Sequence, residues 1–130
     1  MTTTRRRPVF DPADVALFYA SVRESALQDR LRNLCRLLSL HHYHTHDSRR
    51  SERGFPDSVV VRDPEMWEKP WLVLIELKSE KGALTAQQRT WQAALRAAEI
   101  ASGGALAHLL VRPSTWDRFV ELLTAGRKGE

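Results

Sequence analysis

Apolar residues recur at helical spacing over the first third of the chain. Within residues 13–38 they follow one another every three to five positions, which predicts a helical stripe. The polar residues Ser21 and Ser25 predict one break in it, and Asp11 or Asp14 is placed to cap its start. The stripe consists of Val15, Phe18, Val22, Leu27, Leu31, Leu34, Cys35 and Leu38.

The middle of the chain changes to strand patterns, followed by an alternation of helix and strand. Strands are predicted at residues 42–46, 59–61, 71–78 and 106–111, and helices at residues 85–100 and 113–123. The strand at residues 71–78 begins apolar on both faces, which is typical of a central strand. The order α-β-β-β-α-β-α predicts an α/β fold in which helices flank a mixed sheet.

Length and charge narrow the class of protein. The 130 residues leave room for one ordinary domain, which we expect at residues 13–125, after a flexible basic arm at residues 1–12 and before a frayed tail at residues 126–130. Twenty Lys and Arg against sixteen Asp and Glu give a formal net charge of +4. That excess suits a protein that binds an anionic polymer.

Cysteine content and hydropathy indicate the compartment. The single cysteine, Cys35, excludes an intrachain disulfide and a CxxC metal motif, and it favours a reducing compartment. No apolar stretch approaches the ~20 residues that span a bilayer. The basic start lacks the apolar segment of a secretory signal. We therefore expect a cytoplasmic protein with no membrane partner.

Two acids and a lysine suggest a chemical site. On a strand, a spacing of two places Glu76 and Lys78 on one face. Antiparallel pairing with the preceding strand would bring Asp57 beside Glu76, and two close carboxylates stay ionised only with a cation between them. Their hard oxygen ligands suit Mg²⁺ or Mn²⁺, beside which Lys78 could orient water or offset charge. For the Glu-x-Lys pair alone, an exposed charge pair at a strand end remains the alternative.

The ordered motifs resemble a nuclease family. Gly54-Phe-Pro-Asp57, Glu76-Leu-Lys78 and the following segment at residues 80–91 resemble the PD-(D/E)XK nuclease superfamily. More narrowly, they are similar to the virus-type replication-repair nuclease (VRR-NUC) domain of phage proteins and Fanconi-associated nucleases. Residues 44–51 and 110–113 add to the likeness, which spans residues 24–123. The resemblance implies a restriction-endonuclease-like αβββαβ core.

The resemblance also implies roles for single residues. Ser58 departs from the pattern, because family members usually carry an apolar residue after the PD aspartate. Glu24 shares a helix face with Gln28, and an ordinary solvated glutamate is its alternative. The implied catalytic residues are Glu24, Asp57, Glu76, Lys78 and Gln88, and the implied metal ligands are Glu24, Asp57, Glu76 and the main-chain carbonyl of Leu77.

Basic and aromatic residues near these motifs suggest contacts to DNA. Arginines beside hydroxyl groups suit phosphate oxygens, although a solvated loop is the alternative. The histidines at residues 41–46 border the predicted site, and a zinc site or a plain surface strand are the other interpretations. Trp67 could stack on a base or stabilise a dimer, and Trp91 is predicted in the core. The candidate DNA contacts are His44, Ser48, Arg49, Arg50, Ser51, Arg53 and Lys81.

Together these features predict a Mg²⁺- or Mn²⁺-dependent DNA endonuclease. Standalone phage members of the family look like Holliday-junction resolvases, so we expect branched DNA as substrate and a phage or bacterial origin. Two symmetric cuts need two active sites, which predicts a homodimer. The alternatives are a nicking, flap or restriction-like nuclease, or a nucleic-acid-binding subunit whose pocket is idle.

Overall fold

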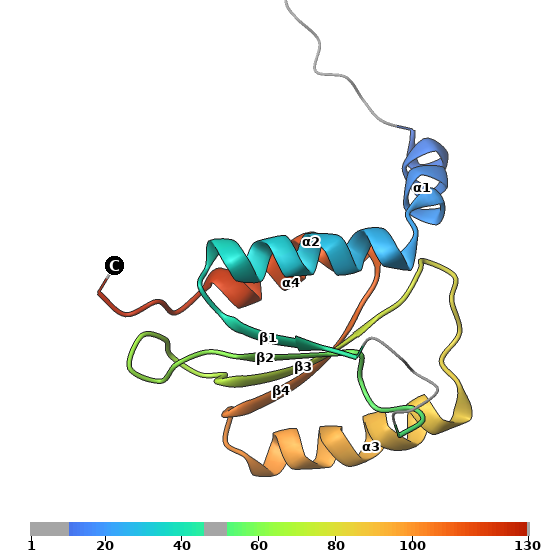
Figure 1. Cartoon of the computed structure of the whole chain (residues 1–130). Coiled ribbons are helices and arrows are strands. Elements are labelled where there is room, and N and C mark those ends of the chain that lie inside the picture. Colours follow the sequence, from blue (N-terminus) through green and yellow to red (C-terminus); the bar gives the residue numbers. More distant parts are fainter. Residues whose placement is uncertain (1–10, 46–51, 130) are drawn as a thin grey trace, which may run out of the picture.

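The described residues form one mixed four-stranded sheet with helices on both faces (Figure 1). The computed structural model describes residues 11–45 and 52–129. The α/β fold predicted from the sequence is confirmed. In chain order the elements are α1 (Pro12–Ser21), α2 (Glu24–Leu37), β1 (His41–His44), β2 (Ser58–Val61), β3 (Leu72–Leu77), α3 (Ala86–Ala101), β4 (Leu106–Val111), the 3₁₀ turn η1 (Pro113–Thr115) and α4 (Trp116–Thr124).

The strand order is that of the chain, β1-β2-β3-β4. The first three strands pair antiparallel, and α3 then carries the chain across to β4, which lies parallel to β3. Ser58 lies opposite Ile75, so Asp57, one residue earlier, comes level with Glu76. The register expected from the sequence is therefore present.

The helical stripe of the N-terminal third divides into two helices with different environments. The break falls at Val22 and Arg23, and the Asp11 side chain caps α1 by accepting from the backbone N–H of Ala13 at 2.9 Å. No residue of α1 is buried, and Phe18 is 60% exposed. The predicted stripe is helical here as well, but its residue Phe18 does not reach the core, because α1 extends beyond the end of the sheet (Figure 1).

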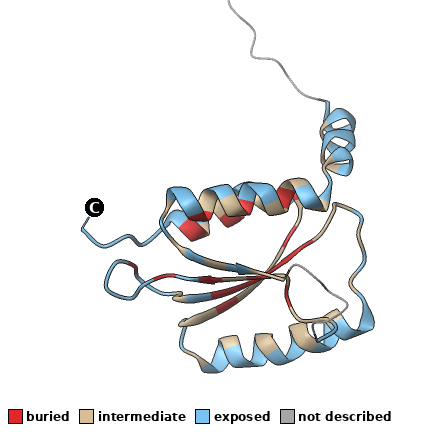
Figure 2. Cartoon of the chain, viewed as in Figure 1, coloured by how far each residue is buried: buried red, intermediate tan, exposed pale blue. Residues whose placement is uncertain are grey.

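The core lies between the sheet and the layer formed by α2 and α4 (Figure 2). On the other face of the sheet α3 contributes no buried residue. Trp91, predicted in the core, is only half-buried. The core residues are Leu27, Leu31, Cys35, Val60, Val73, Ile75, Leu77, Val111, Phe119 and Leu123.

A second cluster covers the end of the sheet at which β2 ends and β3 begins. Arg62 is fully buried and donates to the carbonyls of Pro70 and Ala125, with its guanidinium 4.5 Å from the ring of Trp67. Trp67 is 2% exposed and so is not free to stack on a base or a second subunit.

The chain end contacts the same cluster. We expected residues 126–130 to fray, but the carbonyl of Gly126 accepts from Glu68 N–H at 2.7 Å. Lys128 N–H donates to the carbonyl of Met66 at 2.8 Å, and the ammonium of Lys128 donates to Pro64. The expected arm at residues 1–12 lies mostly outside the described residues. Among the helices that are described, none has both the length and the apolar character that crossing a membrane requires.

Candidate active site

Asp57 and Glu76 lie side by side where β2 begins and β3 ends. Glu76 is only 4% exposed, although it is a charged residue type at the end of a strand. Burial is the main cause that raises the pKa of Glu76, to about 8, and the charge of nearby Asp57 raises it further. Asp57 also accepts a hydrogen bond from the protonated form of Glu76. Glu76 therefore keeps its proton to a higher pH than an ordinary glutamate where a cation is absent.

Gln88 joins this pair from the first turns of α3. Its Nε2 donates to Oε1 of Glu76 at 2.8 Å. Its Oε1 accepts from the backbone N–H of Thr85 at 2.9 Å, and the Thr85 hydroxyl accepts from Gln88 N–H, which completes a capping box. The cap that starts α3 thus also orients the amide toward Glu76.

Glu24 and Lys78 complete the cluster. Glu24 begins α2 and is half-buried, and burial followed by the charge of Asp57 raises its pKa. Lys78 lowers the pKa of Glu24 and of Glu76, so its positive charge acts on both acids. The five residues named as catalytic in the sequence meet at the end of the sheet where α2 and α3 begin (Figure 1).

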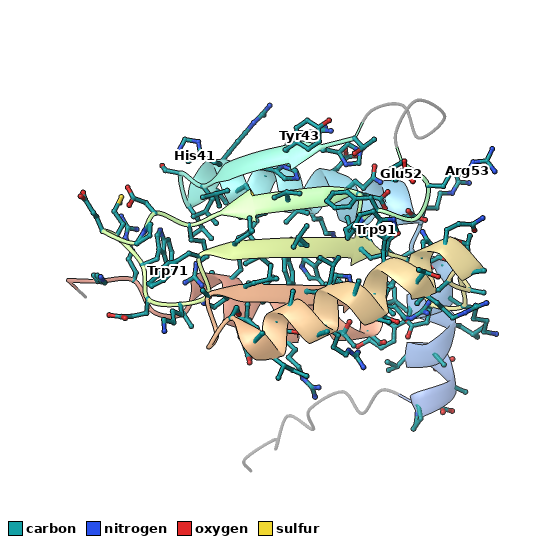
Figure 3. The ribbon with its side chains drawn as sticks, turned by 90° about the horizontal axis from the view of Figure 1, so that it is seen from below. His41, Tyr43, Glu52, Arg53, Trp71 and Trp91 are labelled. Carbon is teal, nitrogen blue, oxygen red and sulfur yellow. The ribbon has the colours of Figure 1, made fainter. Side chains whose placement is uncertain are left out.

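The loop before Asp57 is held against α3 by contacts that the sequence motifs did not indicate. Trp91 Nε1 donates to the carbonyl of Arg53 at 3.1 Å, and Figure 3 labels both residues. The rings of Phe55 and Trp91 pack edge to face at 5.1 Å. Gly54 has φ +87°, and a Cβ there would lie 2.4 Å from the backbone carbon of Gln87. A glycine at this position lets the loop approach the helix that carries Gln88.

The loop after Lys78 is held by Arg112. Its Nη1 donates to the carbonyls of Ser79, Glu80 and Gly82 at 2.7, 3.2 and 2.7 Å. From the sequence no role was assigned to Arg112 itself, because backbone carbonyl partners leave no signal in a sequence. The contacts make it a positioning residue for the segment that follows β3.

A comparison with known families identifies this arrangement. The VRR-NUC domain matches residues 13–112, a span that includes all five clustered side chains. The chain belongs to the VRR-NUC family. No curated protein and no solved structure gives a significant match. A VRR-NUC domain is a nuclease of the PD-(D/E)XK type, which implies DNA as its substrate.

The carboxylate oxygens of this VRR-NUC domain suit one kind of divalent metal site. Within residues 11–45 and 52–129, no three or more His, Cys, Asp and Glu side chains are gathered closely enough to enclose a metal ion. Mg²⁺ usually retains waters and is held by one or two carboxylates together with substrate phosphates. The neighbouring oxygens of Asp57 and Glu76 fit that kind of ion, since a cation would take the place of the proton on Glu76.

The candidate DNA contacts are only partly described. His44 lies beside the site, with Nδ1 3.1 Å from the carbonyl of Asp57 and 3.4 Å from Oγ of Ser58. Ser58 is 1% exposed, so the hydroxyl that departs from the family pattern has a histidine partner in a buried position. Arg53 and Lys81 are exposed. Ser48, Arg49, Arg50 and Ser51, like His46, lie outside the described residues.

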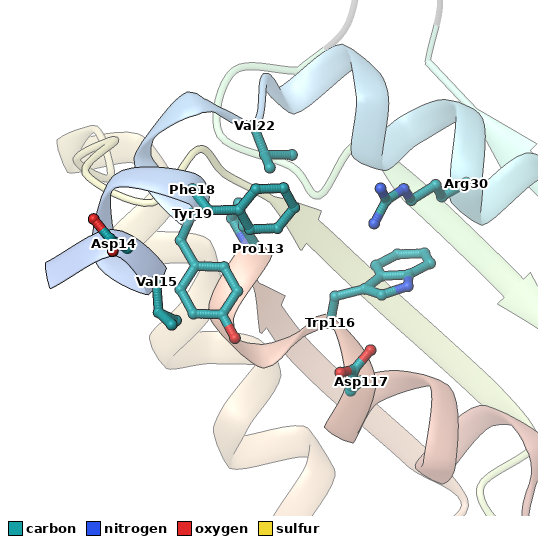
Figure 4. A pocket seen from close by; sticks show the side chains of 9 residues that line it. All are labelled: Asp14, Val15, Phe18, Tyr19, Val22, Arg30, Pro113, Trp116 and Asp117. Carbon is teal, nitrogen blue, oxygen red and sulfur yellow. The ribbon is translucent and has the colours of Figure 1, made fainter. Parts of the chain in front are cut away.

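A hollow of about 580 Å³ lies where α1 meets α2 and α4, apart from the carboxylate cluster (Figure 4). Aromatic side chains of Phe18, Tyr19 and Trp116 border it, together with Arg30. None of the five clustered residues lines it. The hollow therefore does not enter the chemistry proposed below.

Proposed function

We propose that this VRR-NUC domain is a metal-dependent endonuclease that hydrolyses phosphodiester bonds in branched DNA. One observation carries the proposal: the register of β2 and β3 brings Asp57 level with Glu76, a carboxyl group that is only 4% exposed and accepts from Gln88. The charges of Glu24 and Lys78 also act on the pKa of Glu76. A structural ion pair does not need a nearly buried carboxyl group beside a second one. Such a costly arrangement is typical of functional sites.

In the proposed mechanism Asp57 and Glu76 would hold Mg²⁺ or Mn²⁺ together with the main-chain carbonyl of Leu77, and Glu24 would help to hold the ion or its water. When bound, the metal neutralises charge at the scissile phosphate and lowers the pKa of a water. Lys78 directs its ammonium toward the water and the charge that develops on the phosphate.

Gln88 has a positioning role in this mechanism. The amide fixes one oxygen of Glu76 through the 2.8 Å hydrogen bond, which leaves the other carboxylate oxygen for the ion. In-line attack by the water leaves a 5′-phosphate and a 3′-hydroxyl.

Branched DNA is proposed because standalone phage members of the matched family resemble Holliday-junction resolvases. A domain of this kind selects its substrate through phosphate contacts and DNA shape. Symmetric cutting of a four-way junction needs two sites, so the active form is a homodimer. The setting is the host cytoplasm of a phage or bacterial system, in repair or recombination.

The decisive experiment compares Asp57→Asn with the wild type on matched four-way, flap, nicked and linear DNA with Mg²⁺ or Mn²⁺. The wild type should cut the junction in preference to the linear duplex, and Asp57→Asn should lose at least about a hundredfold in rate. Asp14→Asn removes an exposed carboxylate from α1 and serves as the control that keeps activity.

Each other pattern of cutting contradicts part of the proposal. Equal cutting by the wild type and Asp57→Asn would assign the activity to a contaminant. A preference for flap or linear DNA would replace the junction by that substrate. DNA binding that is the same with and without metal, with no product under either ion, would leave a binding subunit instead of a nuclease.

A further inference from the structure

A second hollow, of about 310 Å³, lies between α2 and the edge strand β1. It is separate from the carboxylate cluster, and none of the acids of that cluster lines it. The lining residues are Arg32, Cys35, Arg36, Leu40, His42 and His44. Arg32 and Arg36 are one helical turn apart, and His42 and His44 project from the same face of β1, so two regular elements place four basic side chains around one space.

Among the described residues, no acidic side chain lines this hollow. Asp29 lies close to it, with its Oδ1 3.5 Å from Nη1 of Arg32. The Asp29 side chain is 71% exposed, and a solvated pair of this kind contributes little. The thiol of Cys35 stays neutral, since burial raises its pKa to about 11. The hollow therefore carries positive charge without a fixed counter-charge in its lining.

His42 provides a second, independent observation. Its Nε2 is buried and has no hydrogen-bond partner among the described residues. Burial lowers the pKa of His42, and the nearby charges of His44 and Arg32 lower it further. A buried polar nitrogen without a partner is costly, and a ligand oxygen that accepts from it would remove that cost.

His44 connects the hollow with the candidate active site. His44 lines the hollow and also lies 3.1 Å from the carbonyl of Asp57. Glu24 starts α2, and Arg32 and Arg36 follow eight and twelve residues later on the same helix. At 1.5 Å per residue they lie about 12 and 18 Å further along. At 3.4 Å per nucleotide these distances correspond to roughly three to five nucleotides of one DNA strand.

We propose that this hollow binds backbone phosphates of the DNA strand, about three to five nucleotides from the phosphate that is cut. The arginines form charge-assisted hydrogen bonds to the phosphate oxygens, and His42 donates from Nε2. The proposal rests on the proposed function for the identity of the ligand, since a phosphodiester and a free phosphate offer the same oxygens. It adds a non-catalytic site that fixes the direction in which the strand leaves the cluster.

The test measures binding of a fluorescein-labelled DNA duplex by anisotropy over a series of salt concentrations, without divalent metal, so that nothing is cut. Arg32→Gln/Arg36→Gln should weaken binding and reduce the slope of log K against log salt by about 1.8, since each phosphate contact contributes about 0.9. Arg96→Gln/Arg118→Gln removes the same two charges from exposed positions on α3 and α4. This control should keep nearly the full slope.

Equal losses in the two double variants would overturn the proposal, because general charge would then explain the binding. An unchanged slope in Arg32→Gln/Arg36→Gln would overturn it as well. If circular dichroism shows that the double variant is unfolded, the single variant Arg36→Gln is used for the same binding measurement. Arg36 is exposed, and its loss should reduce the slope by about 0.9.

Free inorganic phosphate is the other ligand that could supply phosphate oxygens to this hollow. If inorganic phosphate raises the melting temperature of the wild type and not of the double variant, while DNA binding is unchanged, the DNA assignment is wrong. Failure of the proposed function has a different signature. A wild type that binds with the expected slopes but never cuts DNA would refute the nuclease and leave the phosphate site in place.

Discussion

Glu76 is the residue in which the structural and chemical demands on this domain conflict most directly. Its side chain is 4% exposed and lies beside Asp57, so the ionised form is disfavoured by both burial and repulsion. The hydrogen bond from Gln88 satisfies one oxygen without supplying a positive charge. Neutralisation is left to a proton, to Lys78 or to an added cation.

This conflict predicts how stability depends on pH in the metal-free protein. The folded pKa of Glu76 is about 8 against 4.5 for an ordinary glutamate, so the folded state binds more protons between those values. The free energy of unfolding should therefore fall as pH rises from about 5 to about 8. Thermal unfolding in EDTA measures this. Glu76→Gln should flatten the dependence, whereas Glu65→Gln, at an exposed position, should leave it unchanged.

A divalent ion should counteract this loss of stability at higher pH. The ion competes with the proton for the same oxygens, so the rise in melting temperature on adding Mg²⁺ or Mn²⁺ should be larger near pH 8 than near pH 6. A metal-independent profile, or an unchanged slope in Glu76→Gln, would show that Glu76 is not the group that titrates.

At the scale of secondary-structure elements, the contact between α3 and the loop before β2 fixes the position of Gln88 relative to Asp57. Gly54 approaches the backbone of α3 so closely that any Cβ would overlap it. The indole of Trp91 fixes the same loop from the side through Arg53 and Phe55. The close approach of Gly54 to α3 therefore aligns the loop that carries Asp57 with the helix that carries Gln88. A buried apolar face of α3 is not what aligns them.

Gly54→Ala should destabilise the protein by about 2 kcal/mol or more, because a left-handed conformation and an overlap of atoms both add cost. Gly103→Ala is the matched control, since Gly103 has φ +65° and nothing within 4 Å of its added Cβ. It should cost only about 1 kcal/mol. Chemical denaturation measures both, and equal losses would remove the close approach as the reason for glycine.

Arg112 has a comparable role on the other side of the cluster. Arg112→Met keeps the aliphatic stem and loses the three bonds to the segment at residues 79–82. We expect a loss of about 2 kcal/mol in unfolding free energy and about tenfold in kcat/KM. Arg89→Met loses a single bond to the carbonyl of Leu84 and should have a smaller effect on both. A normal kcat/KM in Arg112→Met would limit Arg112 to stability.

The elements and the acid cluster were predictable because each depends on local pattern and on strand register. Asp57 meets Glu76 through antiparallel pairing, and Thr85 with Gln88 forms a capping box that a sequence can display. Arg112 was not predictable, because its partners are main-chain carbonyls. The exposure of Phe18 was missed as well, since helical periodicity does not tell whether anything packs against the apolar face.

At the scale of the molecule, one end of the sheet carries the candidate active site and the other end carries a stabilising cluster. One end carries the acids and Lys78, and the other is closed by Arg62, Trp67 and the chain end. Arg127 lies 5.9 Å from the ring of Trp67, across from Arg62. The closing cluster therefore stabilises the sheet without contacting the carboxylates.

Removing residues 126–130 tests this division. The deletion loses the hydrogen bonds from the tail to residues 64–68, so we expect a loss of about 1 to 3 kcal/mol of unfolding free energy and more exposed indole fluorescence from Trp67. Cleavage measured well below the melting temperature should stay within about twofold of the full chain. A large loss of cleavage in a folded deletion variant would show that the two ends are energetically connected.

The dispersed origin of the cluster has a consequence for the life of the chain in a cell. Its side chains come from α2, from the start of β2, from β3 and from α3, so synthesis must pass Gln88 before the last of them exists. A nascent chain that ends before Gln88 lacks part of the set. Under the proposed function, such a chain cannot cut DNA, so the activity appears only after residue 88 has been made and the sheet has formed.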